Sequence, residues 1–94
     1  GTEEKINKIL SEVNFVINND EKGRIIRLAE KLRVPKTEAS LKNFIAAYLR
    51  VFHHLSAKEA DRIASSSKGR RLWERKIRDV PNNPISETEG MKKH

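Results

Sequence analysis

The sequence predicts an all-α fold, a small bundle of four to five short helices around one long central helix. Apolar residues recur at steps of three and four along most of the chain, which is the period of an amphipathic helix. The longest such pattern runs without interruption over residues 37–55. A length of 94 residues suits one small domain. The absence of cysteine excludes a fold held together by disulfides.

The central helix is expected over residues 37–55. Thr37 can cap its amino end by accepting a bond from a backbone N–H, and Glu38 places a negative charge where the helix dipole favours one. The large apolar side chains of this stretch share one face, made of Leu41, Phe44, Ile45, Tyr48, Val51, Phe52 and Leu55. A face of this width predicts the middle of a hydrophobic core, with shorter helices packed against it.

Two shorter helices are expected before the central one. The first covers residues 2–17, and the second covers residues 21–33 after a cap at Asp20. The apolar stripe of the first helix consists of Ile6, Ile9, Leu10, Val13, Val16 and Ile17. Phe15 lies opposite this stripe, so it either contacts the next helix or docks a partner.

Two further helices are expected after the central one. Ser56 and Glu59 match a capping box, which predicts the start of a short helix. The serine run at residues 65–67 is interpreted as a polar loop or as the cap of the last helix, in preference to a phosphorylation site following Arg62. The last helix is expected over residues 68–80. Its apolar side is formed by Trp73, Ile77 and Val80.

The helical pattern stops well before the end of the chain. Residues 1–80 are expected to form a single helical domain. Residues 81–94 contain two prolines and paired asparagines with few apolar residues, which predicts a disordered tail. No apolar run approaches the roughly 20 residues that a membrane span requires, and no signal-peptide pattern is present, so an intracellular protein is expected.

The helices on either side of residues 34–36 resemble a helix-turn-helix. The residues that carry the resemblance are Leu28, Ala29, Leu32 and Val34. In that motif the exposed amino end of the second helix reads base edges, which implies contacts from Lys36, Lys42 and Asn43. The motif usually carries glycine where this chain has Arg33. An antiparallel helical hairpin that binds nothing accounts for the same apolar pattern.

The chain is strongly basic. Its 20 lysines and arginines outnumber 13 aspartates and glutamates, which gives a formal net charge of +7. This excess favours a polyanionic partner, which is nucleic acid (DNA in preference to RNA), an acidic protein or an anionic membrane surface. The further candidate contacts are Arg24, Arg27 and Lys31 on the second helix and Lys68, Arg70, Arg71, Arg75 and Arg78 on the last. The alternative is that these cations form an ordinary solvated surface.

No pattern for catalysis or cofactor binding is found. His53 and His54 are adjacent, so on a helix they point about 100° apart and cannot bind one metal ion together. The four glycines form no phosphate-binding loop. The sequence therefore predicts a non-catalytic nucleic-acid-binding or regulatory module without cofactor or metal. The alternative is an adaptor domain that docks a partner protein through its basic surface, Phe15 or Trp73. The sequence leaves the oligomeric state open.

Overall fold

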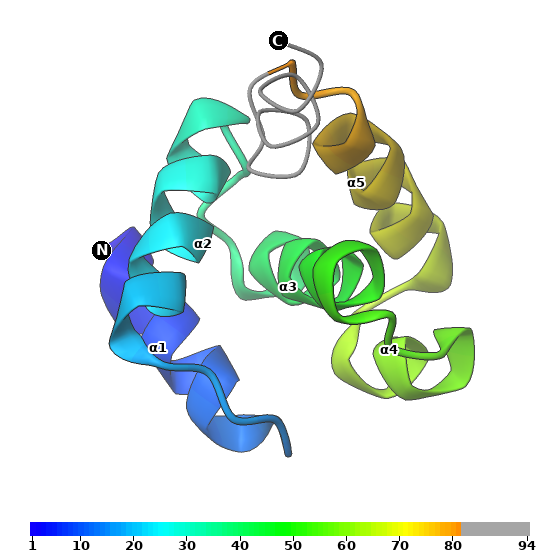
Figure 1. Cartoon of the computed structure of the whole chain (residues 1–94), viewed down its shortest axis with the longest axis horizontal. Coiled ribbons are helices and arrows are strands. Elements are labelled where there is room, and N and C mark those ends of the chain that lie inside the picture. The colour runs from blue at the N-terminus through cyan, green and yellow to red at the C-terminus, as the bar shows by residue number, and fades with distance from the viewer. Residues whose placement is uncertain (82–94) are drawn as a thin grey trace, which may run out of the picture.

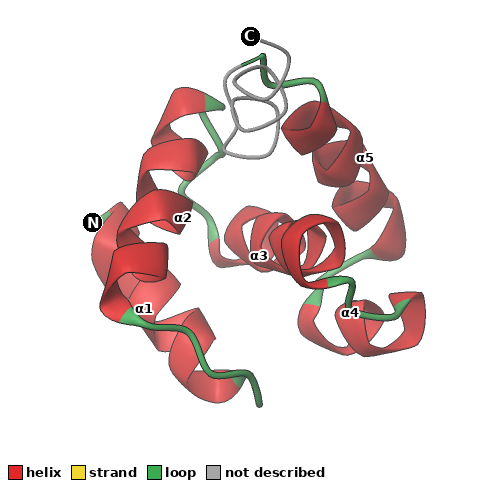
Figure 2. Cartoon of the chain, in the orientation of Figure 1, coloured by secondary structure: helices red, strands yellow, loops and turns green. Residues whose placement is uncertain are grey.

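The computed structural model describes residues 1–81, which form five α-helices and no strand (Figures 1 and 2). The helices are α1 (Thr2–Glu12), α2 (Asn19–Lys31), α3 (Glu38–His53), α4 (Ala57–Ile63) and α5 (Ser67–Arg78). The predicted all-α bundle is confirmed. Within these residues no helix has the length and apolarity needed to cross a membrane. The predicted tail lies outside the described residues, apart from its first residue, Pro81.

The long helix α3 occupies the middle of the molecule. Figure 1 shows α1 and α2 on one side of it and α4 and α5 on the other. Leu41 and every residue from 43 to 49 are buried, so the middle of α3 is enclosed all round. The expectation of a single buried face is therefore wrong. Ala46 and Ala47 lie away from the predicted apolar face, and their small side chains allow the neighbouring helices to approach closely.

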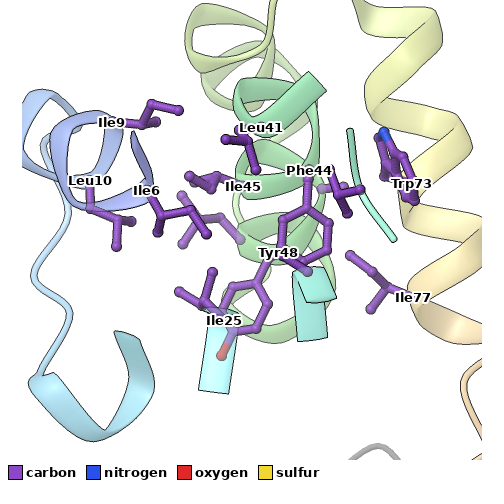
Figure 3. Packing of buried hydrophobic residues seen from close by; sticks show 14 residues of the cluster. Ile6, Ile9, Leu10, Ile25, Leu41, Phe44, Ile45, Tyr48, Trp73 and Ile77 are labelled. Atoms are coloured by element: carbon purple, nitrogen blue, oxygen red, sulfur yellow. The ribbon is translucent and has the colours of Figure 1, made fainter. Parts of the chain in front are cut away.

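The core joins side chains from helices on both sides of α3 (Figure 3). Ile6 of α1 and Ile25 of α2 are completely buried on one side, and Ile77 of α5 is completely buried on the other. Phe44 of α3 meets Trp73 of α5 edge to face, with ring centroids 6.1 Å apart and an angle of 87° between the rings. This geometry suits the quadrupoles of aromatic rings. The first and last helices are thus held together through α3.

Side-chain oxygens cap the starts of three helices as the sequence predicts. Thr37, Ser56 and Ser66 each accept a hydrogen bond from the backbone N–H three residues later, at 3.1–3.2 Å. The start of α2 differs from the prediction, because Asn18 supplies the cap that was assigned to Asp20. Because Asn and Asp are about equally good caps, the pattern alone could not decide between two positions so close together.

The first helix is shorter than the sequence predicts. It ends at Glu12, and Val13 already has extended backbone angles (φ −89°, ψ 144°). Val16, assigned to the buried stripe, is 95% exposed. The chain instead turns after α1 and packs Phe15 against the core. Val13, Phe15 and Ile17 pack against the core at every second position, so this segment follows the period of extended backbone in place of the helical period.

Replacement of Phe44 by alanine should lower the free energy of unfolding by about 3–5 kcal/mol, because the shorter side chain leaves a cavity where α3 meets α5. Urea denaturation measures the loss. Lys42→Ala on the same helix is the control. Its side chain is half-buried and pairs with Glu38 at 3.1 Å, so the cost should be at most about 0.5 kcal/mol. Similar losses from both changes would contradict the enclosure of α3.

Candidate nucleic-acid interface

Helix α5 presents a line of exposed cations to solvent. We define the α5 stripe as Lys68, Arg71, Arg75 and Arg78. These positions follow one another at steps of three and four, so they share one face and span about 15 Å along the helix axis. Trp73 turns the opposite side of the helix into the core. The predicted exposure of these four residues is confirmed.

A shallow depression of about 640 Å³ lies at the amino end of the α5 stripe. Its lining consists of Ser66, Lys68, Gly69, Arg71, Leu72 and Arg75. Three of the four stripe cations thus border one concave surface, where charges of one sign reinforce one another. Leu72 is 41% exposed and adds an apolar contact to this surface.

The exposed side chains of α5 are five cations and Leu72, because the helix's single acidic residue, Glu74, is buried. Glu74 pairs with Arg70 one turn earlier, and Arg70 also donates from Nε to Asp61 Oδ1 at 2.9 Å. Arg70 is only 3% exposed. The expectation that Arg70 contacts nucleic acid is therefore wrong. Its side chain lies between α4 and α5, where it neutralises the carboxylate that would otherwise reduce the positive charge of this face.

The buried carboxylate of Glu74 also connects α5 to α3. Its Oε1 lies 3.7 Å from Nε of Arg50 and 3.6 Å from a guanidinium nitrogen of Arg78. Arg50 in turn donates to the carbonyl oxygen of Leu55 at 2.8 Å. The Glu74 carboxylate thus lies near cations of both α3 and α5 and helps to hold α5 in its position on α3. The spacing of Arg70 and Glu74 indicates a helical ion pair, but no local signal indicates its burial.

Asn43 is buried as well, at 9% exposure, so its predicted place on an exposed reading surface is wrong. Its Oδ1 accepts bonds from the backbone N–H groups of Ser65 at 2.7 Å and Ser66 at 2.9 Å. Gly69 allows this close packing, because a Cβ there would lie 2.4 Å from Asn43 Nδ2. Asn43 therefore holds the loop from which α5 starts.

The turn between α2 and α3 keeps one feature of a helix-turn-helix. Arg33 has a φ of 55°, the left-handed conformation that favours the glycine usually found there. The motif's second helix must nevertheless be free to enter a groove, and the middle of α3 is enclosed. Lys36 is exposed before α3, whereas Lys42 is half-buried beside Glu38. The exposed residues of α3 are therefore confined to its first turn, at Glu38 and Ala39, and the rest of the helix offers no exposed face to a groove.

The cations predicted on α2 form a second surface. Arg24, Arg27 and Lys31 are all exposed. Figure 1 shows α2 across α3 from α5, so the structure does not bring these side chains together with the α5 stripe. The predicted contact residues are thus divided between two sides of the molecule, and three of those on α5, Lys68, Arg71 and Arg75, border one depression.

A polar cluster on the α2 side joins residues far apart in the sequence. Glu21 Oε2 accepts a bond from the Tyr48 hydroxyl at 2.7 Å and lies 2.6 Å from His53 Nε2. Phe15 contacts the His53 ring edge-on, with centroids 4.8 Å apart. Phe15 was predicted to contact the next helix or to dock a partner, and the ring it contacts instead belongs to α3. Phe15 also lines a groove of about 410 Å³ beside α1 and α4.

The environment of this cluster changes two pKa values. Partial burial alone would raise the pKa of Glu21, but hydrogen bonds from Tyr48 and His53, with the charges of His53 and Arg24, lower it below its ordinary value. Burial, with the bond to the Glu21 carboxylate, raises the pKa of Tyr48. Neither Glu21 nor His53 was singled out as a partner of the other, because sequence spacing does not report a contact across 32 residues.

The lowered pKa of Glu21 predicts a pH-dependent contribution to stability. The folded chain favours the ionised carboxylate, so the contribution is complete above the unfolded-state pKa and is lost as pH falls through the lower folded-state pKa. Glu21→Gln should therefore have a lower free energy of unfolding than the parent at about pH 6, and this difference should be smaller at about pH 3. Urea titrations at the two pH values measure it. Glu30→Gln, an exposed change on α2, should leave the free energy of unfolding close to that of the parent at both pH values. A loss of unfolding free energy in Glu21→Gln that is the same at both pH values would contradict this role of Glu21.

Replacement of Arg70 by methionine should cost about 3–5 kcal/mol of unfolding free energy, because Glu74 loses its closest buried partner. Thermal or urea denaturation measures the change. Arg71→Met, the same substitution one residue later at an exposed position, should stay within about 0.5 kcal/mol. Comparable stabilities for the two variants would show that Arg70 is not held as described.

Comparisons with models of protein families, with curated proteins and with solved structures found no match for this chain. Among the described residues, no group of three or more His, Cys, Asp or Glu side chains could hold a metal ion.

Proposed function

We propose that this chain is a non-catalytic nucleic-acid-binding module that contacts backbone phosphates through the α5 stripe. The observation that supports the proposal is the one-sided charge of α5. Five cations are exposed on this helix, and its single carboxylate is buried in an ion pair. The positive end of the helix dipole lies beside Lys68 and adds to the attraction for anions.

The dimensions of the stripe suit a duplex backbone. A duplex carries one negative charge per roughly 1.7 Å of its axis, so the stripe's length of about 15 Å faces several phosphates on both strands. If each of the four cations neutralises one phosphate, the logarithm of the binding constant should fall with the logarithm of salt concentration at a slope of about −3.6. Affinity should then decrease about 150-fold between about 50 and 200 mM salt.

The chemistry of the stripe favours binding with little sequence preference. Arginine and lysine on one exposed face can reach phosphates, which are common to every sequence. The amide side chain proposed from the sequence to read bases, Asn43, is bonded to the loop between α4 and α5 instead. The stripe is therefore proposed to recognise the duplex backbone, and a DNA duplex is the first form to test.

An adaptor that binds an acidic protein is the second candidate. The observation in its favour is the exposure of Leu72 within the basic depression, because protein contacts often combine an apolar anchor with a charged rim. Such an anchor would keep much of its affinity at high salt, whereas phosphate contacts would not. Leu72→Ala should weaken a protein contact and leave duplex binding close to that of the parent.

The triple substitution of Arg71, Arg75 and Arg78 by glutamine should reduce affinity for a short random DNA duplex by on the order of 100-fold at low salt. The salt slope should flatten to about −0.9, since Lys68 alone is left. Fluorescence anisotropy at several salt concentrations measures both effects. Circular dichroism should still report the helical fold, because all three side chains are exposed.

A matched triple substitution tests whether the effect is local. Arg27, Lys31 and Lys36 are exposed on the α2 side, and their replacement by glutamine removes the same net charge away from α5. This control should lose little affinity. Equal losses in the two variants would assign binding to overall charge and overturn the α5 stripe as the interface. A parent protein that binds no duplex even at low salt would favour the adaptor.

A further inference from the structure

The loop between α4 and α5 lies directly beside the proposed interface. Ser65 and Ser66 are exposed, and Ser66 lines the basic depression with Lys68 and Arg71. We propose that Ser65 is a phosphorylation site for an arginine-directed protein kinase and that its phosphorylation weakens binding of nucleic acid by the α5 stripe. The modification site stands on the loop alone, and its regulatory effect rests on the proposed function.

Ser65 differs from its two neighbours in the freedom of its hydroxyl. Ser66 Oγ accepts a bond from Gly69 N at 3.1 Å as the cap of α5. Ser67 lies in the first turn of that helix and is half-buried. The Ser65 hydroxyl is exposed and makes no hydrogen bond within the described part of the chain, where its backbone N–H bonds to Asn43. Its oxygen is therefore available as a phosphate acceptor without loss of a helix cap.

Arg62 supplies a recognition element three residues before Ser65. Its side chain is 64% exposed and pairs with Glu59 at 3.1 Å on the surface of α4. Such an exposed pair is weak, so carboxylates of a kinase groove can replace Glu59 as the partner of the guanidinium. Arg62 and Ile63 end helix α4, and the residues on either side of the acceptor are extended, with ψ of 150° at Ala64 before it and 145° at Ser66 after it. A peptide in this form can be bound along a groove.

The reaction transfers the terminal phosphoryl group of Mg·ATP. Ser65 Oγ attacks the γ-phosphorus, the new Oγ–P bond forms, and the bond from that phosphorus to the β,γ-bridging oxygen breaks. ADP leaves with the bond's electron pair, and the hydroxyl proton passes to the catalytic carboxylate of the kinase. The product carries a charge of about −1.5 to −2 near neutral pH.

The added charge would act directly on the α5 stripe. Three trans peptide units place the Cα atoms of Ser65 and Lys68 at most about 11 Å apart, close to the screening length of about 10 Å at 0.1 M salt. A phosphoserine can therefore pair with Lys68, or with Arg71 one turn further, and compete with phosphates of the nucleic acid. Removal of one phosphate contact should lower affinity about tenfold at 0.1 M salt and reduce the slope to about −2.7.

The test uses the full chain, Mg·ATP and the catalytic subunit of cyclic-AMP-dependent protein kinase, which selects arginine before its acceptor. Mass spectrometry of fragments should place one phosphate on Ser65. Ser65→Ala should abolish that incorporation, and Arg62→Gln should slow it. Both unphosphorylated variants should bind the DNA duplex as the parent does, because neither residue belongs to the stripe. The phosphorylated parent should then show the weaker binding and the flatter salt slope.

The outcomes separate this inference from the proposed function. Absence of phosphate on Ser65, or incorporation that Ser65→Ala leaves unchanged, overturns the modification site whether or not the parent binds duplex. Phosphorylation of Ser65 with unchanged affinity overturns the regulatory effect and leaves the proposed function supported. A parent that binds no duplex overturns the proposed function and the regulatory effect together, while phosphate mapped to Ser65 still supports the site.

Discussion

Enclosure of α3 is the constraint on which the other contacts depend. Because the middle of this helix is buried all round, polar side chains there and at its edge need partners inside the protein, since an unsatisfied buried polar group is costly. Asn43 finds two backbone N–H groups in the loop before α5, and Arg50 approaches Glu74 and the carbonyl oxygen of Leu55. These contacts, together with the Phe44–Trp73 packing, decide where α5 lies.

The same internal contacts shape the charge of the surface. Arg70 and Glu74 are one turn apart on α5 and pair in the interior, so they contribute nothing to the exposed face. The remaining cations of this helix are exposed, and of these Arg78 lies 3.6 Å from the buried Glu74 carboxylate. Stability and the proposed binding thus depend on different arginines of one short helix. Because Arg70 is buried with Glu74, the exposed Arg71 next to it adds positive charge to a face of α5 that has no exposed carboxylate.

The two basic surfaces differ in what surrounds them. On α2, Arg24 lies near the carboxylate of Glu21, whose pKa its charge helps to lower. On α5, the stripe borders a depression that also contains Leu72 and the capping residue Ser66. The second surface therefore combines uncompensated charge, concavity and a neighbouring loop with a free hydroxyl. This combination is the physical basis for preferring α5 as the interface and Ser65 as its point of control.

The sequence by itself determined the helices, most of their caps and the positions of the exposed cations, because these depend on local periodicity and on contacts three or four residues apart. Thr37, Ser56 and Trp73 all lie where their patterns indicate. Tertiary structure alone decided that Asn43 and Arg70 are buried, that Phe15 packs against the core while Val16 is exposed, and that Glu21 meets His53. A polar side chain has the same local pattern whether it faces water or a buried partner, and only the packing of distant helices distinguishes the two.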